Sequence, residues 1–566
     1  MRFVLTFALA CVISAIATAQ LPSGRQDPFV AMAVSYPAGL VRDRERTTAD
    51  FDAIRAGGFN AVRLVVSWAD VEPVRGQYRL EVVDGALELA GRSGLRVIVR
   101  LDTAFPPAWV FDRYPDGRYV PADGAARAAT RACFDHPAVR ADVEAFVAAV
   151  TAKAAGHAAL LAVDVGSDLD SGFCLCPHTA RRFREWTKAT FGETSRSPAQ
   201  RTDDQTAFVA ITRRDHLAWL AAAAAARGNR PLLSSSKTPS LLRPSEAPLG
   251  QDDWLMARVV DRYGMVVPLS YRSVSGVLPS QLALAFDGVR GAAGANGWFA
   301  SLDDDTSAVD LRLWTWAAVS RGARSVMYGD WRTGEASTGA VLSGSDVRVA
   351  ERAQTAAGLS RVIGRNPALF APLRPGKAKV AFIYDPRADA ARIDWARVYQ
   401  AFFERNIQVD VVHLDELASG AISGHVLVAS RPIAELPPVA AAALKAYADS
   451  GGKLLTVSTR GPALDEIVRA AEASGVTPVV RIAGAGGVVE TRFLESSDVL
   501  MLIGVNHSDT RQRVTMTFPP DTQEAIWQNM ETGAAVNFIA GPEGPTYTYT
   551  FGAKDALVLM IRKNIR

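Results

Sequence analysis

The chain has 566 residues, with 62 basic and 59 acidic side chains and a formal net charge of +3. At about 150 residues per domain, this length predicts several domains, and the 49% hydrophobic content excludes a disordered chain. So balanced a charge gives no overall field for binding nucleic acid or an anionic membrane surface.

The first 19 residues have the layout of an export signal. Arg2 is a short positive start, Phe3–Ile16 is almost wholly apolar, and Ala17-Thr18-Ala19 fits a small-x-small cleavage site. We therefore expect residues 1–19 to be a signal peptide, maturation at Gln20, and export to the periplasm or the extracellular space. A lipoprotein signal ending at Cys11 and an uncleaved anchor stay open. Beyond this segment no apolar run of about 20 residues occurs, so no membrane span is predicted.

Eight apolar runs bounded by turn residues follow, with helical patterns between them. Strands that are buried on both faces read as unbroken apolar runs of this kind. The alternation predicts a (β/α)8 TIM barrel over residues 20–370. An open doubly wound sheet is the rival, but no Gly-x-Gly-x-x-Gly loop follows the first run. The predicted strands are Phe29–Tyr36, Ala61–Trp68, Leu95–Leu101, Leu160–Val165, Pro231–Ser235, Met265–Leu269, Gly297–Leu302 and Arg324–Tyr328.

Acidic and aromatic side chains gather where these runs end, which is where barrel active sites form. Gly166–Asp170 follows the fourth run and Ser301–Asp305 follows the seventh. Aromatic faces stack on sugar rings, while carboxylates bind hydroxyls and perform acid–base work, so the pattern predicts a carbohydrate site. Alternatively, the tryptophans pack in the core and the second acidic segment is a solvated loop or helix cap. The tryptophans are Trp68, Trp109, Trp298, Trp314, Trp316 and Trp331.

Two further domains are predicted after the barrel. Arg365–Lys377 is rich in proline, glycine and alanine and has the composition of a linker. Residues 378–476 alternate strand and helix patterns, which predicts a smaller parallel α/β domain. Residues 477–566 hold a succession of short strand-like segments, which predicts an all-β sandwich.

Three cysteines remain after the expected signal peptide: Cys133, Cys174 and Cys176. An odd number in an exported protein leaves at least one thiol unpaired. A zinc ion would account for all three, since structural zinc sites take four nitrogen or sulfur ligands. The alternative is one disulfide between Cys133 and one of the other two, with a buried free thiol; a bridge within Cys174-x-Cys176 would be strained.

Several short motifs occur in a fixed order along the chain. They are Gly58–Arg63, Ser67-Trp68, Glu72-Pro73-x-x-Gly76-x-Tyr78, Pro106–Trp109 with Tyr114-Pro115, Cys133–Pro137, Cys174–His178 with Phe183 and Trp186, and Arg312–Trp316 with Trp331-Arg332. In this order they resemble glycoside hydrolase family 42, the retaining β-galactosidases, over nearly the whole mature chain. The resemblance implies a TIM barrel, a trimerisation domain similar to class I amidotransferases, and a C-terminal β-sandwich.

The resemblance implies two catalytic glutamates, at the ends of strands four and seven, and this chain departs from both. Ser167-Asp168 stands where the family has Asn-Glu, although a shift of two residues would align Val165-Gly166 there. Ser301 aligns with the family nucleophile, which leaves Asp303 as the nearest acid. The expected general acid is therefore Asp168, and the opposing carboxylate is Asp303, with Asp304 behind it. A hydrolase, an enzyme of altered stereochemistry, and a sugar-binding protein without catalysis all stay open.

The expected substrate-binding residues are Arg63, Trp68, Trp109, Tyr271, Trp298, Trp331 and Glu335. Glu335 aligns roughly with a family glutamate that binds the sugar, and Arg63 aligns with a family arginine at the second strand. For Arg63 an equally good interpretation is a buried arginine that pairs with acids inside the barrel mouth, and for Glu335 it is an ordinary loop charge.

The resemblance also implies a zinc site formed by four cysteines. Here the position of the last cysteine holds Thr179, so the adjacent His178 is the expected fourth ligand, beside Cys133, Cys174 and Cys176. No cofactor is expected for catalysis itself. The α/β segment contains no cysteine, which excludes amidotransferase chemistry. The expected partners are a carbohydrate substrate and two further copies of the chain in a homotrimer.

Overall fold

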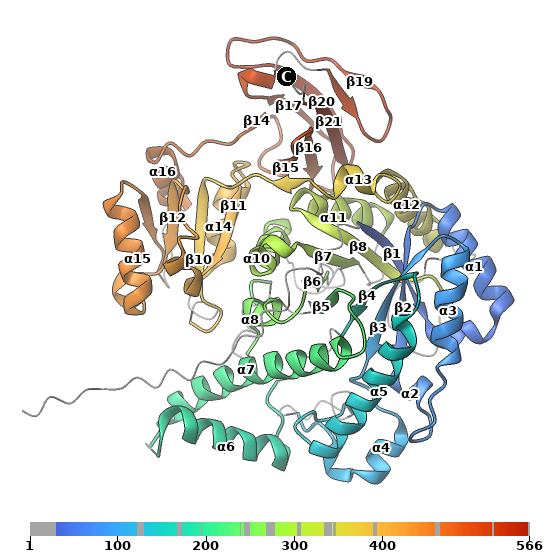
Figure 1. Cartoon of the computed structure of the whole chain (residues 1–566). Coiled ribbons are helices and arrows are strands. Elements are labelled where there is room, and N and C mark those ends of the chain that lie inside the picture. The colour runs from blue at the N-terminus through green and yellow to red at the C-terminus, as the bar shows by residue number, and fades with distance from the viewer. Residues whose placement is uncertain are drawn as a thin grey trace, which may run out of the picture.

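A computed structural model shows a barrel that carries two smaller units, an α/β domain beside it and a β-sandwich above it (Figure 1). The structure describes residues 30–121, 130–166, 172–193, 195–237, 239–242, 250–267, 278–302, 307–332, 342, 347–388, 393–458, 464–522 and 526–563. The predicted signal peptide lies outside these ranges. Among the described helices, none is both long and apolar enough to cross a bilayer.

The barrel consists of eight parallel strands in sequential order, closed by pairing of the first with the last. This confirms the predicted TIM barrel followed by further sheet-containing units. The strands are β1 (Ala31–Pro37), β2 (Ala61–Ser67), β3 (Arg96–Asp102), β4 (Leu160–Asp164), β5 (Leu232–Ser236), β6 (Arg262–Val266), β7 (Trp298–Leu302) and β8 (Ala323–Asp330).

Helices surround the strands (Figure 1). Apolar side chains of the strands and of these helices pack in one buried cluster. Local sequence sets several of the helix ends. The helix α7 begins at a capping box in which Ser197 and Gln200 bond each other's backbone, and α5 begins at Pro137 after His136 caps it. The helices are α1 (Arg44–Ala56), α2 (Trp68–Val71), α3 (Glu81–Arg92), α4 (Ala108–Arg113), α5 (Pro137–Ala155), α6 (Pro177–Phe191), α7 (Pro198–Ala225), α8 (Asp253–Ala257), α10 (Pro279–Ala293), α11 (Ala308–Ser320), α12 (Val347–Ile363) and α13 (Pro367–Phe370).

The barrel interior is apolar at its amino end and polar at its carboxyl end. The layers at the amino end are filled by a buried apolar cluster that includes Ala33, Ala61 and Phe299. Since side chains alternate along a strand, the residues two positions further on face the same interior. Those residues are Ser35, Arg63 and Ser301, and all three are buried.

The sixth strand begins three residues earlier than predicted, at Arg262 rather than Met265. Arg262 and Gly264 precede the apolar run on which the prediction relied, so the sequence pattern does not mark the start of the strand. Gly264 is required by packing, because a Cβ there would lie 2.5 Å from the carbonyl oxygen of Phe299. Tertiary contact with the neighbouring strand therefore determines this position.

The α/β domain contains one parallel sheet in the order β11-β10-β12-β13. Its strands are β10 (Val380–Tyr384), β11 (Val409–His413), β12 (Leu427–Ser430) and β13 (Lys453–Thr456), and its helices are α14 (Trp395–Phe403), α15 (Pro438–Asp449) and α16 (Leu464–Ala473). The order places the strand-order reversal between β10 and β12, as in flavodoxin-like sheets.

The C-terminal unit has a three-stranded sheet, β14-β17-β20, and a six-stranded sheet, β19-β18-β21-β16-β15-β9. The predicted linker supplies the edge strand β9 (Arg374–Pro375), which pairs with β15. The other strands are β14 (Arg481–Ala483), β15 (Val489–Glu495), β16 (Val499–Asn506), β17 (Gln512–Thr517), β18 (Trp527–Asn529), β19 (Ala535–Val536), β20 (Thr546–Phe551) and β21 (Ala556–Arg562).

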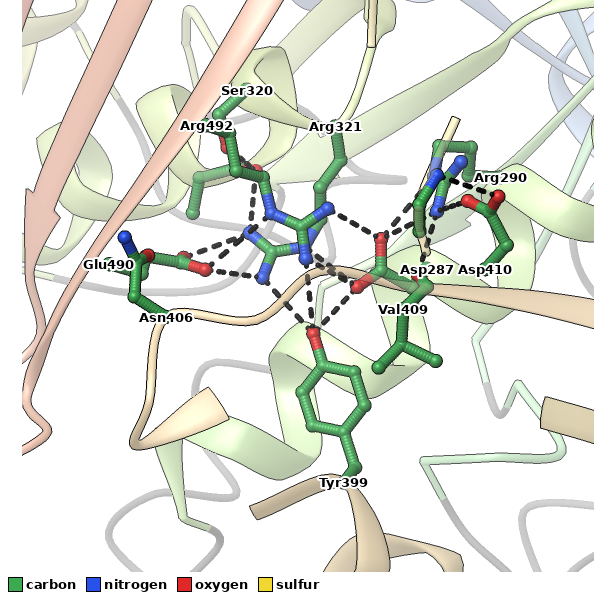
Figure 2. Close-up of polar contacts among 12 residues, drawn as sticks. Asp287, Arg290, Ser320, Arg321, Tyr399, Asn406, Val409, Asp410, Glu490 and Arg492 are labelled. Atoms are coloured by element: carbon green, nitrogen blue, oxygen red, sulfur yellow. Dashed lines mark hydrogen bonds and ion pairs between the residues drawn. The ribbon is translucent and has the colours of Figure 1, made fainter. Parts of the chain in front are cut away.

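A buried cluster of charges joins the barrel, the α/β domain and the sandwich (Figure 2). We call it the three-domain ion cluster; it comprises Asp287, Arg290, Arg321, Tyr399, Asp410, Glu490 and Arg492. At its centre, the carboxylate of Asp287 accepts from the Tyr399 hydroxyl at 2.6 Å and from Arg492 Nη2 at 2.7 Å. The two Nη groups of Arg321 bond both oxygens of Glu490, at 2.9 and 2.8 Å.

The three-domain ion cluster is balanced, because its three arginines face three carboxylates. Burial opposes ionisation of Asp287, but the charges of Arg492, Arg321 and Arg290 outweigh it and hold the pKa of that carboxyl below its usual value. The pKa of Glu490 is likewise held well below its usual value, because Arg321 and His507 overcome the effect of burial. Removing one member would leave its partners buried and uncompensated.

Candidate active site and metal centre

Arg63 lies at the centre of the polar layer inside the barrel and is 2% exposed. Its Nε and Nη2 donate to Ser35 Oγ at 2.9 and 2.7 Å, and its Nη1 donates to Ser301 Oγ at 2.7 Å. One guanidinium thus links β1, β2 and β7. The structure supports the interpretation of Arg63 as a buried arginine inside the barrel and shows it bonded to two serines.

The expected catalytic acids Asp168, Asp303 and Asp304 lie outside the described residues. The structure does describe the strand ends that precede them. At the end of β4, Asp164 Oδ1 accepts from the Gly166 amide at 3.1 Å, and Ser234 Oγ donates to the Gly166 carbonyl at 2.7 Å. Asp303 is the residue after β7, which ends at Leu302.

Trp68 and Trp298 are core residues, contrary to the prediction that they bind substrate. They are 0% and 1% exposed. Trp68 stacks on Phe146 of α5, while the Trp298 indole donates to the carbonyl of Arg321 and packs against Phe286 of α10. Both rings therefore point from the strands toward the surrounding helices, where no sugar can reach them.

Trp109 and Trp331 remain partly exposed, but the protein already uses the indole N–H of each. Trp109 donates to the carbonyl of Glu72 at 2.9 Å, and Trp331 donates to Asp50 Oδ1 at 3.2 Å. Each therefore offers a ring face and no free donor to a ligand. The expected Tyr271 and Glu335 lie outside the described residues.

Two buried acids that are not among the expected site residues orient the rings near the strand ends. Glu72 is 2% exposed and accepts from the indole of Trp68 and the amide of Gly76, both at 2.7 Å. Asp50 is also 2% exposed, and its carboxylate accepts hydrogen bonds from Tyr36, Trp331 and Arg332. The signal in the sequence for Asp50 was its place directly before Phe51, on a stretch of α1 that is buried. A carboxylate buried there needs polar partners.

Three cysteines meet beside the barrel mouth, in the loops that precede α5 and α6. The sulfurs of Cys133, Cys174 and Cys176 all lie within 4.8 Å of one another, and all three thiols are free and buried. Backbone amides point at two of them: Val120 N–H donates to Cys174 Sγ at 3.3 Å and Thr179 N–H donates to Cys176 Sγ at 3.4 Å. Converging sulfurs with amide donors fit a thiolate-bound metal ion.

His178 does not join the three sulfurs, so the prediction that it is the fourth ligand is wrong. Its Nε2 lies 2.9 Å from Asp116 Oδ2, and its ring lies 4.5 Å from the ring of His136. The residue next to the sulfurs is Thr179, whose Oγ1 lies 3.5 Å from Cys133 Sγ and 3.4 Å from Cys176 Sγ. Helix geometry is the reason, since adjacent residues of α6 point in directions about 100° apart.

Asp116, His136 and His178 form a second group with metal-ligand chemistry. His136 Nδ1, however, accepts the Val139 amide that it caps, at 3.2 Å. A neutral imidazole with an accepting Nδ1 carries its proton on Nε2, and this is the atom that faces Asp116 at 3.3 Å. Because a protonated nitrogen cannot ligate a metal, this group is better described as histidines paired with an aspartate.

Comparison with known proteins relates the chain to one family. A family model described as β-galactosidase, of glycoside hydrolase family 42, matches residues 40–199. Over 150 residues the chain is 27% identical to the β-galactosidase BgaA of Clostridium cellulovorans; the match covers 26% of this chain and 23% of that protein. The matched segment thus spans about a quarter of the relative. The residues matched by the family model, 40–199, include β2 to β4, Arg63 and the three cysteines.

Solved structures extend the likeness of fold to almost the whole chain. The β-galactosidase of Bacillus circulans sp. alkalophilus has a TM-score of 0.76 at 14% identity, covering 94% of this chain and 99% of that one. An α-L-fucosidase from Paenibacillus thiaminolyticus has a TM-score of 0.65 at 10% identity, covering 94% and 99%. The resemblance to glycoside hydrolase family 42 is confirmed, while the fold by itself is compatible with more than one sugar.

Proposed function

We propose that this protein is a glycoside hydrolase of the β-galactosidase type that cleaves a terminal glycosidic bond. The observation that carries the proposal is the position of the family-matched segment. Residues 40–199 form β2 to β4 and their loops, and Arg63 of that segment bonds Ser301 of β7 across the barrel interior. This bond ties β2 of the matched segment to β7, the strand that precedes the proposed opposing carboxylate.

Asp168 is proposed as the general acid and Asp303 as the opposing carboxylate, with Asp304 as its substitute. They follow β4 and β7, which are three strands apart in the eight-stranded barrel. A separation of about 5–5.5 Å between the carboxyls would give retention of anomeric configuration, and about 6.5–9.5 Å would give inversion. Asp168 is one methylene shorter than the glutamate it replaces, which favours the wider separation.

The test compares two aryl β-galactosides with good and poor leaving groups. Asp168→Asn should lower kcat/KM for the poor leaving group by about 10²–10⁴-fold and for the good one much less, because only the poor one needs protonation. Asp303→Asn should lower both. The control is Asp112→Asn, an exposed aspartate of α4, which should change neither. Equal activity of Asp168→Asn and the unmodified protein on both substrates would remove Asp168 from the mechanism. Proton NMR of the first product gives the anomeric outcome.

A sugar-binding protein without catalysis is the second candidate, and Ser301 is the observation that favours it. Ser301 aligns with the family nucleophile, is 0% exposed and accepts from Arg63. If calorimetry shows that the protein binds galactosides and no β-glycoside is hydrolysed, this second function is selected. Ser301→Glu would then place a carboxylate beside Arg63, and a gain of hydrolysis in that variant would identify the lost nucleophile.

The three free cysteines are proposed to hold a structural zinc ion. The convergence of the three sulfurs and the amide donors that point at two of them support a zinc ion better than they support a disulfide. Elemental analysis of the purified protein should give one zinc per chain and no thiol that reacts with Ellman's reagent before denaturation. Zinc-free protein with one titratable thiol would select the disulfide.

Export and trimerisation are further proposals. The amino-terminal residues 1–19 support export, and N-terminal sequencing of protein from the periplasm or medium should begin at Gln20. The likeness to β-galactosidases supports a homotrimer. Light scattering at micromolar concentration should give three times the mass of the chain, and a monomer would reject the assembly.

A further inference from the structure

The metal site of this protein differs from a closed four-cysteine site at one corner. Among the described residues, the atom that completes the group of three sulfurs is Thr179 Oγ1, 3.4 Å from Cys176 and 3.5 Å from Cys133. A threonine hydroxyl is a far weaker ligand for a soft metal ion than a thiolate. Closed sites hold four strong ligands, whereas sites that bind external molecules have three and one replaceable position.

The direction of the Thr179 hydroxyl is set by a carboxylate outside the sulfur group. Its Oγ1 donates to Asp135 Oδ2 at 2.6 Å, and the same carboxylate receives Arg182 and His216, at 2.7 and 3.0 Å. Since the proton points toward Asp135, the oxygen lone pairs face the sulfurs. Thr179 can therefore touch a metal ion held by the cysteines, but only as a neutral oxygen donor.

A cavity of about 60 Å³ adjoins this corner. Two of the three cysteines, Cys133 and Cys174, line it together with Thr179. A metal ion held by the sulfurs would therefore have the cavity on its Thr179 side. The remaining walls include Tyr119, Phe173, Phe208, Thr212, Arg213 and His216.

The cavity contains a polar group without a partner. Thr212 lines it, is 9% exposed, and its Oγ1 is buried with no hydrogen-bond partner. A buried hydroxyl that lacks a partner costs free energy, which a bound molecule can offset. The guanidinium groups of Arg131 and Arg213 line the same cavity and outnumber the one carboxylate there, that of Asp135, so its net charge suits an anion.

We propose that Cys133, Cys174 and Cys176 form a metal site with an exchangeable fourth position, at which a small thiolate entering through the cavity displaces Thr179. In this exchange the thiolate sulfur forms a bond to the metal ion and the Thr179 oxygen leaves it. The hydroxyl keeps its proton, which stays hydrogen-bonded to Asp135. The incoming ligand arrives as the thiolate, its proton already released to solvent, and no oxidant or reductant is required. The inference rests on the proposed metal site and not on the glycosidase proposal.

The test uses the full-length protein loaded with Co(II), whose visible absorption bands report the ligands of the ion. Titration with 2-mercaptoethanol should shift these bands saturably in the unmodified protein, while gel filtration shows that one Co(II) per chain is retained. Thr179→Cys closes the fourth position and should weaken the response at least tenfold. It should also slow transfer of zinc to a chelator by at least tenfold. Thr179→Ser keeps the hydroxyl and should behave like the unmodified protein.

A second variant tests the cavity itself. Thr212→Val should weaken thiol binding by about fivefold, the effect of losing one hydrogen bond, with the Co(II) content unchanged. Bands that do not respond to thiol while Co(II) stays bound would overturn the exchangeable position. A chain that binds no Co(II) or zinc would overturn the metal site with it, and the glycoside assays would be unaffected by either result.

Discussion

Replacing Asp287 by asparagine tests whether the three-domain ion cluster holds the protein together. The substitution keeps the shape of the side chain and removes its charge. Asp287 is 0% exposed and faces Arg290, Arg321 and Arg492. After the change, three buried cations would face only the carboxylates of Glu490 and Asp410.

The expected loss follows from this imbalance. Removing one partner of a buried ion pair costs about 3–5 kcal/mol, because the remaining charge stays desolvated. The asparagine amide would also bring its N–H groups against arginine donors at one of the two oxygen positions. The free energy of the first unfolding transition should therefore fall by about 3–5 kcal/mol.

Urea unfolding at pH 7 measures the change, and limited proteolysis near residues 371–379 reports whether the domains separate first. The control is Glu88→Gln, which removes a carboxylate whose side chain is 43% exposed and which pairs with Arg44 and Arg92 on the surface. That variant should unfold almost as the unmodified protein does. If Asp287→Asn loses no more stability than Glu88→Gln, the cluster does not hold the domains together.

Four further predictions concern stability. Gly291→Ala should cost about 1–3 kcal/mol by urea unfolding, since its Cβ would lie 2.2 Å from the carbonyl oxygen of Val411, whereas Gly156→Ala, with nothing within 4 Å, should cost nothing. Arg63→Lys keeps the charge but loses the fork to two serines, and should cost about 1–3 kcal/mol. Burial raises the pKa of Asp252 to about 6, so its ionisation removes stability as pH rises from about 4 to 6; Asp252→Asn should add up to about 3 kcal/mol at pH 7 and less at pH 4. The carboxylates of the three-domain ion cluster have lowered pKa values, so their contribution is complete above about pH 4 and is lost on further acidification; a stability curve flat down to pH 2 would contradict this.

Most elements of the fold could be predicted from local sequence. Runs such as Ala61–Trp68 are apolar except at Arg63 and Ser67, because both faces of a barrel strand are buried, and this pattern survives in a single sequence. Arg262 and Gly264 break the pattern in β6, and there only contact with the neighbouring strand shows where the strand begins. The two-residue strand β9 has no sequence signal of its own, because it exists only by pairing with β15.

The candidate site was less predictable, because side-chain direction depends on packing. Tryptophan next to a strand end is typical of sugar sites and also of cores, and Trp68 and Trp298 are core residues. His178 and Thr179 are neighbours in sequence, yet only Thr179 faces the sulfurs, since one residue along a helix rotates the side chain by about 100°. The residue types therefore predicted that the three cysteines meet, and the helix register decided that Thr179 and not His178 lies beside them.

The sequence alone determined that the protein is a barrel with two further units and that it carries a group of three cysteines within the family's motifs. These follow from periodicity and spacing, which are local properties of the chain. The tertiary structure decided that Arg63 joins two serines inside the barrel and that Asp287 joins three domains. Both are contacts between segments far apart in the chain, and buried polar groups find their partners only when those segments pack together.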